Sequence, residues 1–206
     1  MYQIKNFGLA EYQQIWTAMQ EFTNKRTADT PDEFWVGEHY PIFTLGLAGK
    51  EEHIIQATGN IPILRTDRGG QVTYHGRGQV IIYILVDLKR IGISIRELVT
   101  RIENGVINFL ASLNIKSTSN RDAPGVYVAN KKISSLGLKV KRGCTYHGLS
   151  FNLDMDLQPF NLINVCGYKG LQVTKLSELC TIENRTLTIE KLIKYLTTSI
   201  YAIITD

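Results

Sequence analysis

The chain has 206 residues, of which 44% are hydrophobic and 20% are charged, and its formal net charge at pH 7 is +4. A chain of this length and composition is typical of one globular domain that buries about 70% of its unfolded surface, so we expect residues 1–206 to form a single domain. The charge is too mild to favour nucleic-acid binding, which a strong basic stripe would indicate.

The sequence gives no sign of a membrane segment or an export signal. No apolar run approaches the ~18 residues that span a bilayer, and the first segment lacks the apolar core of a signal peptide. The cysteines Cys144, Cys166 and Cys180 are odd in number and have no CxxC spacing. This pattern argues against a disulfide framework or a zinc site and favours the reducing cytoplasm.

The hydrophobic pattern predicts three main helices. Apolar residues recur at helical spacing over residues 9–23. Ser94 and Glu97 form a capping box that opens a second helix. A third amphipathic helix is predicted to begin at Thr188, after a polar stretch at Glu183–Arg185 that could mark the boundary of a small C-terminal piece.

Short apolar, β-branched runs predict the strands. They are Phe34–Glu38, Ile42–Leu47, Ile61–Arg65, Val72–Tyr74, Val80–Val86, Gly125–Val128, Lys132–Val140 and Thr145–Leu153. Because helices and strands do not alternate regularly, we expect an α/β (α+β) domain in which helices flank a mixed sheet.

The segment from Arg68 to Gln79 combines four glycines with two arginines, a histidine and two glutamines. A glycine-rich hairpin between two strands is the simplest interpretation. The interleaved Val, Thr and Tyr residues favour instead a wall where the backbone approaches a ligand closely.

Cys166 is the strongest candidate for a reactive side chain. A lone cysteine is usually a small buried hydrophobe, but Gly167 and Gly170 predict a tight turn that would expose this one. Reactivity requires a lowered thiol pKa, for which Lys132 and His147 are candidate cations. Lys132 could equally be a solvated lysine at a strand edge.

Other candidate side chains give weaker signals. If Lys132 points inward from a strand, Lys131 must face the surface. Cys144 and Cys180 are interpreted as packing residues, with Cys180 in a predicted helix. His39 and His53 are expected in loop or strand-edge positions and have no recognisable partner.

Several motifs, in order along the chain, resemble those of the lipoate-biosynthesis octanoyltransferases, the LipB family. They are Arg68 to Gly76 with Gly78-Gln79, Ala123 to Val128, Lys132 to Gly137, Arg142 to Leu149, and Ile163 to Tyr168. The resemblance extends from about Phe34 to Leu179. Motifs that match in the right order are far more specific than any one of them alone.

The resemblance implies a cytoplasmic enzyme with the fold of biotin and lipoate protein ligases. Such an enzyme moves an octanoyl group from octanoyl acyl carrier protein to a lysine of an apo lipoyl domain. These domains belong to 2-oxoacid dehydrogenases and to the H protein of the glycine cleavage system. Neither a metal nor a cofactor is implied, and we expect a monomer that binds no nucleic acid and no membrane.

The resemblance also implies roles for individual residues. Cys166 would be the nucleophile that forms an acyl thioester, and Lys132 would lower its pKa and act as acid and base. The substrate-binding positions would be Arg68, Gly69, Gly70, Gln71, Val72, Thr73, Tyr74, His75, Ser135, Leu136, Gly137, Gly148, Leu149 and Ser150. The chain departs from the family at Val165 and Arg77, where proline is usual. The first departure could loosen the cysteine turn, and the second could alter the mouth of the site.

Two other functions remain open from the residues alone. An ATP-dependent lipoate or biotin protein ligase would share the fold but would need no nucleophilic cysteine. A non-catalytic acyl-binding module would use the polar cluster only to hold a carboxyl group.

Overall fold

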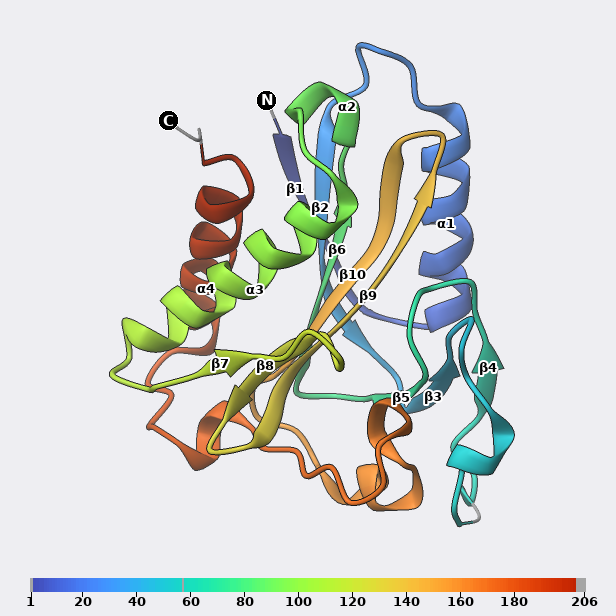
Figure 1. Cartoon of the computed structure of the whole chain (residues 1–206), viewed down its shortest axis with the longest axis vertical. Coiled ribbons are helices and arrows are strands. Elements are labelled where there is room, and N and C mark those ends of the chain that lie inside the picture. Colours follow the sequence, from blue (N-terminus) through green and yellow to red (C-terminus); the bar gives the residue numbers. More distant parts are fainter. Residues whose placement is uncertain (1, 57, 203–206) are drawn as a thin grey trace.

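The computed structural model describes residues 2–56 and 58–202. Within these residues a seven-stranded mixed sheet forms the centre of the molecule, in the order β1-β2-β6-β10-β9-β8-β7 (Figure 1). β1 pairs with β2 in parallel, and the other neighbours pair antiparallel. The strands are β1 (Tyr2–Ala10), β2 (Asp32–His39), β6 (Gln79–Leu85), β7 (Thr118–Ser119), β8 (Gly125–Val128), β9 (Lys131–Lys141) and β10 (Cys144–Asn152).

Helices cover both faces of this sheet (Figure 1). They are α1 (Tyr12–Lys25), the short α2 (Leu88–Ile91), α3 (Ile95–Ala111) and α4 (Arg185–Ile200). Alternate residues of β6 point to opposite faces, so Ile82 packs in the core of α3 and α4 while Ile81 packs against Met19 of α1. Because both faces are covered, all of β6 is buried. The predicted mixed sheet with flanking helices is therefore confirmed.

The beginning of the chain differs from the prediction. Residues Tyr2–Ala10 form β1, and the helix predicted from residue 9 begins at Tyr12. The strand is stabilised by its register with β2, in which Tyr2 lies opposite Asp32. Most of β1 is exposed at the edge of the sheet, so its sequence carries little periodic hydrophobic signal.

The C-terminal helix belongs to the main hydrophobic core. α4 starts at Arg185, earlier than predicted, because the Asn184 side chain caps it by accepting from the Leu187 amide. Leu196 packs closely on Gly105 of α3, so the polar stretch before α4 does not begin a detached piece. No helix in the described part of the chain is long and apolar enough to cross a bilayer.

A second, three-stranded sheet lies beside one end of the large sheet. It consists of β4 (Ile63–Arg65), β3 (Ile42–Leu45) and β5 (Val72–His75), in that order. Side chains of β3 and β5 share a small core with Met155, Phe160, Ile163 and Val165. This core holds the segment that contains Cys166 against β5.

Candidate active site

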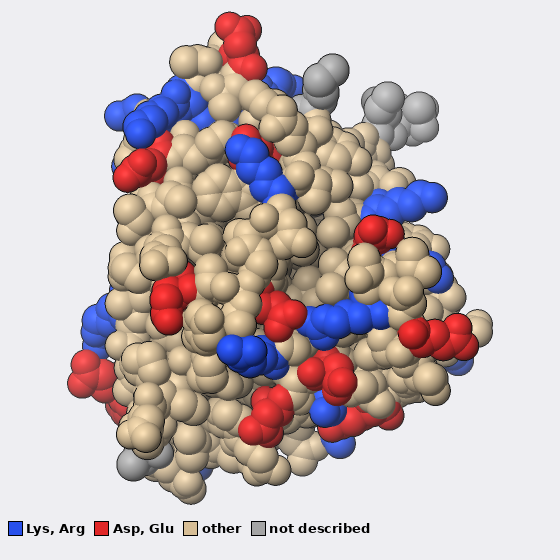
Figure 2. Space-filling model, turned by 180° about the vertical axis from the view of Figure 1, so that it is seen from behind, with Lys and Arg blue, Asp and Glu red and all other residues tan. Residues whose placement is uncertain are grey.

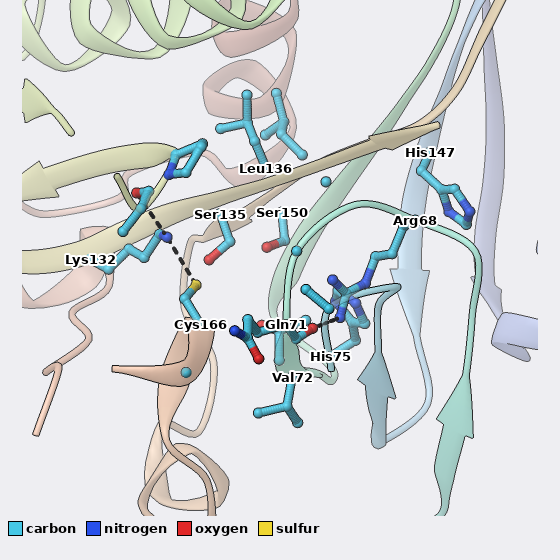
Figure 3. A pocket seen from close by; sticks show the side chains of 18 of the residues that line it. Arg68, Gln71, Val72, His75, Lys132, Ser135, Leu136, His147, Ser150 and Cys166 are labelled. Carbon is cyan, nitrogen blue, oxygen red and sulfur yellow. Dashed lines mark hydrogen bonds between the residues drawn. The ribbon is translucent and has the colours of Figure 1, made fainter. Parts of the chain in front are cut away.

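A cavity of about 530 Å³ lies between the glycine-rich segment, the strands β9 and β10, and the turn that carries Cys166. Figure 3 shows Lys132 and Cys166 facing each other at one end of it, and Arg68, His75 and His147 at the other. Ser135 and Ser150 lie between the two ends. This volume falls within the range of small-molecule binding sites.

Lys132 enters the cavity from β9. Successive residues of a strand face opposite sides, so Lys131 is exposed while only 1% of Lys132 is accessible. The Lys132 Nζ donates to the Cys166 Sγ at 3.0 Å and to the Ala123 carbonyl at 3.3 Å. A lysine so buried requires polar partners, and here they are a carbonyl and a thiol.

The space for the Lys132 side chain depends on Gly125. A Cβ at this position would lie 2.5 Å from the Lys132 Cε and would clash with the Ser134 carbonyl oxygen. The Gly125 amide donates to Glu103 Oε1 at 2.8 Å, which fixes this part of β8. Burial raises the pKa of Glu103, although the nearby ammonium of Lys132 partly opposes that shift.

Cys166 lies in a single 3₁₀ turn, Val165–Gly167, and itself has the left-handed backbone angles φ 54° and ψ 20°. The Gly167 amide donates to the Asn164 carbonyl at 2.8 Å, and the Tyr168 amide donates to the Val165 carbonyl at 3.0 Å. The left-handed conformation is costly for a residue with a side chain and is common at functional sites. The turn presents the half-buried sulfur to Lys132.

The main chain beyond this turn forms hydrogen bonds with the main chain of Lys132. The Lys132 amide donates to the Gln172 carbonyl at 2.9 Å, and the Thr174 amide donates to the Lys132 carbonyl at 3.0 Å. Lys132 and Val173 thus form an isolated parallel bridge. These bonds hold the strand that carries the lysine and the loop that carries the cysteine at a fixed separation.

Arg68 organises the glycine-rich wall. Its buried guanidinium donates to the Thr44 carbonyl at 2.6 Å, the Gly69 carbonyl at 2.9 Å and the Gln71 carbonyl at 2.7 Å. A Cβ on Gly137 would lie 2.8 Å from the Gly69 carbonyl oxygen, so the wall approaches β9 backbone to backbone. The arginine thus stabilises the curve of this segment.

The far end of the cavity is a buried polar cluster around His147. The His147 Nε2 lies 2.8 Å from Asp67 Oδ1, and its Nδ1 lies 3.4 Å from the Tyr12 hydroxyl. Burial lowers the pKa of His147. Burial raises the pKa of Asp67, but hydrogen bonds from His147 and Tyr146 outweigh that effect and lower it. His147 was a candidate cation for Cys166, but the structure places it at the opposite end of the cavity (Figure 3).

Most of the predicted site residues line this one cavity, although they come from distant parts of the chain. They are Arg68, Gly70, Gln71, Val72, Thr73, His75, Lys132, Ser135, Leu136, Gly137, Gly148, Leu149, Ser150 and Cys166. Two are placed elsewhere: Tyr74 packs in the second core against Phe43 and Phe160, and Gly69 lies behind the wall against Leu138.

Sequence reasoning missed several residues that line the cavity, including Tyr12, His53 and Tyr83. In the sequence, Tyr12 and Tyr83 occupy apolar positions of a helix and a strand, so their hydroxyls carry no separate signal. His39 was expected to lack a partner, but it is fully buried and lies 2.7 Å from the Tyr83 hydroxyl. His53 lies at the cavity wall beside Gly167.

The two departures from the family pattern leave the pair of Lys132 and Cys166, here called the dyad, in place. Val165 is buried in the second core, and the hydrogen bonds of the turn form without a proline. Arg77 lies in the tight turn between β5 and β6, where its guanidinium stacks 5.2 Å from the centre of the Tyr40 ring. Arg77 is outside the cavity lining.

The mixed sheet with flanking helices is the fold of lipoate and biotin protein ligases. The structure is similar to that of a bi-partite lipoate protein ligase from Thermoplasma acidophilum, with a TM-score of 0.77 over 97% of this chain and 83% of the other. The sequences are 13% identical, so this likeness concerns the fold alone.

A family model described as the lipoyl protein ligase A/B catalytic domain matches residues 11–201, so the chain belongs to this family. It is 52% identical over 203 residues to the octanoyltransferase of Aliivibrio fischeri, covering 95% of this chain and 90% of the relative. It is 56% identical over 176 residues to the octanoyltransferase of Saccharophagus degradans, covering 85% and 81%. The resemblance drawn from the ordered motifs is therefore confirmed.

Proposed function

We propose that this chain is an acyltransferase that moves an octanoyl group from octanoyl acyl carrier protein to a lysine of an apo lipoyl domain, through a thioester on Cys166. The observation that carries the proposal is the 3.0 Å contact of the Lys132 Nζ with the Cys166 Sγ inside the cavity. A thiol beside a cation is the arrangement that favours the nucleophilic thiolate. The octanoyltransferase relatives supply the reaction to which this pair would contribute.

The first half-reaction begins from a Cys166 thiolate and a Lys132 ammonium. The thiolate attacks the carbonyl carbon of the octanoyl thioester, and the carbon–sulfur bond to the carrier then breaks. The departing carrier thiolate takes a proton from Lys132, which leaves this lysine neutral. One thioester replaces another, so the step needs no ATP.

The second half-reaction returns the enzyme to its starting state. The amine of the acceptor lysine attacks the thioester on Cys166, and neutral Lys132 takes the proton that the new amide nitrogen loses. Cys166 leaves as a thiolate beside the restored ammonium. An amide is more stable than a thioester, so the transfer runs downhill.

The acyl chain would lie along the cavity, beginning at Cys166. Ile81, which lies opposite Ser150 and on the same face of the sheet, supplies apolar lining between the dyad and the polar far end. At roughly 0.8 kcal/mol for each buried methylene, the carbons beyond the carbonyl would contribute about 5 kcal/mol of binding free energy. This is enough to favour octanoyl over much shorter chains.

The partners are expected to dock near the end of the cavity that holds the dyad. An acidic carrier protein could be attracted by the basic stretch from Lys131 to Arg142. β9 rises by about 3.3 Å per residue, so Lys141 and Arg142 lie far along the hairpin from Cys166, and Lys131 is the nearer charge. On the face seen in Figure 2, acidic and basic side chains are interspersed.

Several finer points extend the proposal. The acceptors would be the lipoyl domains of 2-oxoacid dehydrogenases and the H protein of glycine cleavage. The enzyme would act in the cytoplasm as a monomer, since two protein partners must reach one dyad in turn.

Intact-protein mass spectrometry after mixing with octanoyl acyl carrier protein, without ATP, tests the proposal. We expect the protein to gain one octanoyl group and to lose it when an apo lipoyl domain is added. Cys166→Ala should gain none. Labelling that appears only with ATP and free octanoate would instead assign the chain to the ligases, and acyl binding without any covalent adduct would assign it to the binding modules.

A further inference from the structure

Three buried polar atoms on the cavity wall have no hydrogen-bond partner among the described residues. They are Gln71 Oε1, Thr73 Oγ1 and His53 Nδ1. A buried polar atom without a partner is unfavourable, because folding removes its hydrogen bonds to water and supplies none in return. Each such atom calls for an explanation, and in a ligand cavity a role of its side chain toward the ligand is one.

Of these side chains, Gln71 and His53 lie directly against the cysteine turn. A Cβ on Gly167 would be 2.8 Å from the Gln71 Cδ, 2.9 Å from its Nε2 and 3.0 Å from the His53 Cε1. His53 therefore presents a ring carbon to the turn, whereas Gln71 presents a carboxamide with its donor nitrogen. Figure 3 shows the Gln71 side chain extending toward Cys166.

The position of Gln71 is fixed through its main chain. Its carbonyl oxygen accepts from the Arg68 guanidinium at 2.7 Å and from the Gly46 amide at 3.1 Å. Because these bonds use only the main chain, the carboxamide remains available at the side of the sulfur. A donor that is already in place costs no reorganisation when charge develops beside it.

We propose that the Gln71 carboxamide is an oxyanion donor for both half-reactions, an inference that rests on the proposed acyl transfer. As the bond from Cys166 to the acyl carbon forms, the carbonyl electron pair moves onto oxygen, and a Gln71 Nε2–H donates to it without transferring its proton. When the tetrahedral intermediate collapses, the pair returns and the weaker hydrogen bond remains. Lys132 acts at the sulfur and not at the carbonyl oxygen. Its Nζ already donates hydrogen bonds to the Cys166 Sγ and to the Ala123 carbonyl.

Gln71→Met tests this role, because methionine has a similar length but no donor. Two rates are measured on the same protein: acylation by octanoyl acyl carrier protein and alkylation by iodoacetamide. Alkylation consumes the same thiolate but builds no oxyanion, so it reports on Lys132 and on the integrity of the turn. We expect acylation to fall about 10²–10³-fold, with alkylation and its pH profile unchanged. Gln14→Met on the exposed surface of α1 is the matched control and should leave both rates unchanged.

A variant that acylates at the normal rate would overturn the inference, and so would one whose two rates fall together. If Gln71→Met does not fold, Gln71→Glu keeps the shape of the side chain. Its carboxylate cannot donate, so the ratio of acylation to alkylation should be low at neutral pH and rise as the carboxyl is protonated. A ratio that does not change with pH would contradict the role of Gln71. Failure of the unmodified protein to become acylated would instead contradict the proposed function.

Discussion

The ammonium of Lys132 has two acceptors, the Cys166 Sγ at 3.0 Å and the Ala123 carbonyl at 3.3 Å. It also lies 5.3 Å from the centre of the Tyr127 ring, whose negative face attracts a cation. The carbonyl and the ring hold the lysine in place whatever the state of the sulfur. The proposed two-step transfer needs a lysine that stays in place while it exchanges a proton, and these two contacts support that role.

Replacing Lys132 should affect the thiol and the transfer together. In Lys132→Met the thiolate loses its neighbouring charge and both proton transfers lose their agent, so we expect transfer to fall about 10²–10⁴-fold. Alkylation of Cys166 by iodoacetamide should slow as well. Lys131→Met removes an exposed lysine from the adjacent position of the same strand and should preserve both rates. Equal loss in the two variants would contradict the assignment of Lys132.

The three cysteines should respond differently to substitution. Cys166→Ala should form no acyl-enzyme, whereas Cys144→Ser and Cys180→Ser should retain most of the activity. Burial raises the pKa of both Cys144 and Cys180, which disfavours their reactive thiolate forms. At the buried position 144, serine should cost about 1–3 kcal/mol of stability if its hydroxyl lacks a partner. Mass spectrometry after octanoyl transfer measures the first effect, and an inactive Cys144→Ser that still folds would identify a different nucleophile.

Gly125→Ala should displace the Lys132 side chain without changing its chemical identity. The added methyl group would lie 2.5 Å from the Lys132 Cε, and the backbone angle φ +146° is unfavourable for alanine. We expect roughly a 100-fold loss of transfer if the ammonium moves by about 1 Å. Gly143→Ala in the turn between β9 and β10 is the control: its φ of +80° is also unfavourable, but no atom lies within 4 Å of the new methyl group. That variant should lose stability and keep its specific activity.

Stability should decrease as the pH falls below about 6.5, the usual pKa of histidine. Burial lowers the pKa of His39 to about 4, while the backbone hydrogen bond to Ala10 partly opposes the shift. Burial also lowers the pKa of His75 to about 3. The unfolded chain therefore binds more protons than the folded one between these values and pH 6.5, and each histidine contributes a slope of about 1.4 kcal/mol per pH unit.

Urea unfolding at several pH values between about 7 and 5 measures this slope. His39→Gln removes one of the histidines whose pKa is lowered by burial, as it is in His75 and His147. The number of protons taken up on unfolding should fall by about one, and the slope with it, whatever the effect of the substitution on stability at neutral pH. A variant with the original slope would show that His39 does not remain neutral in the folded state.

Local patterns predicted a large part of this molecule. The alternation of a strand correctly placed Lys131 on the surface and Lys132 inside, and the glycines after Cys166 correctly predicted a tight turn. The capping residue Ser94 also starts α3, where its hydroxyl accepts from the Glu97 amide. In each case the determining interactions lie within a few residues of the chain.

Features that depend on distant contacts could not be predicted in this way. β1 forms because it pairs with β2, although the whole of α1 separates the two strands in the sequence. The polar end of the cavity assembles Tyr12, His39, Tyr83 and His147 from four different elements. Each of these residues, considered in its own segment, resembles an ordinary core or loop residue, and only the folded chain reveals the cluster.

The hydrogen bonds between the Lys132 main chain and the segment after Cys166, together with the contact of the two side chains, close a short loop of chain. Its dimensions depend on the few residues that separate Cys166 from Gln172, while the second core holds the turn against β5. If single codons are inserted at random positions in the gene, the loss of activity should therefore differ strongly between positions. Exposed turns such as that at Gly143 would accept an extra residue, whereas one more residue between Cys166 and Gln172 would shift the sulfur out of reach of its partner.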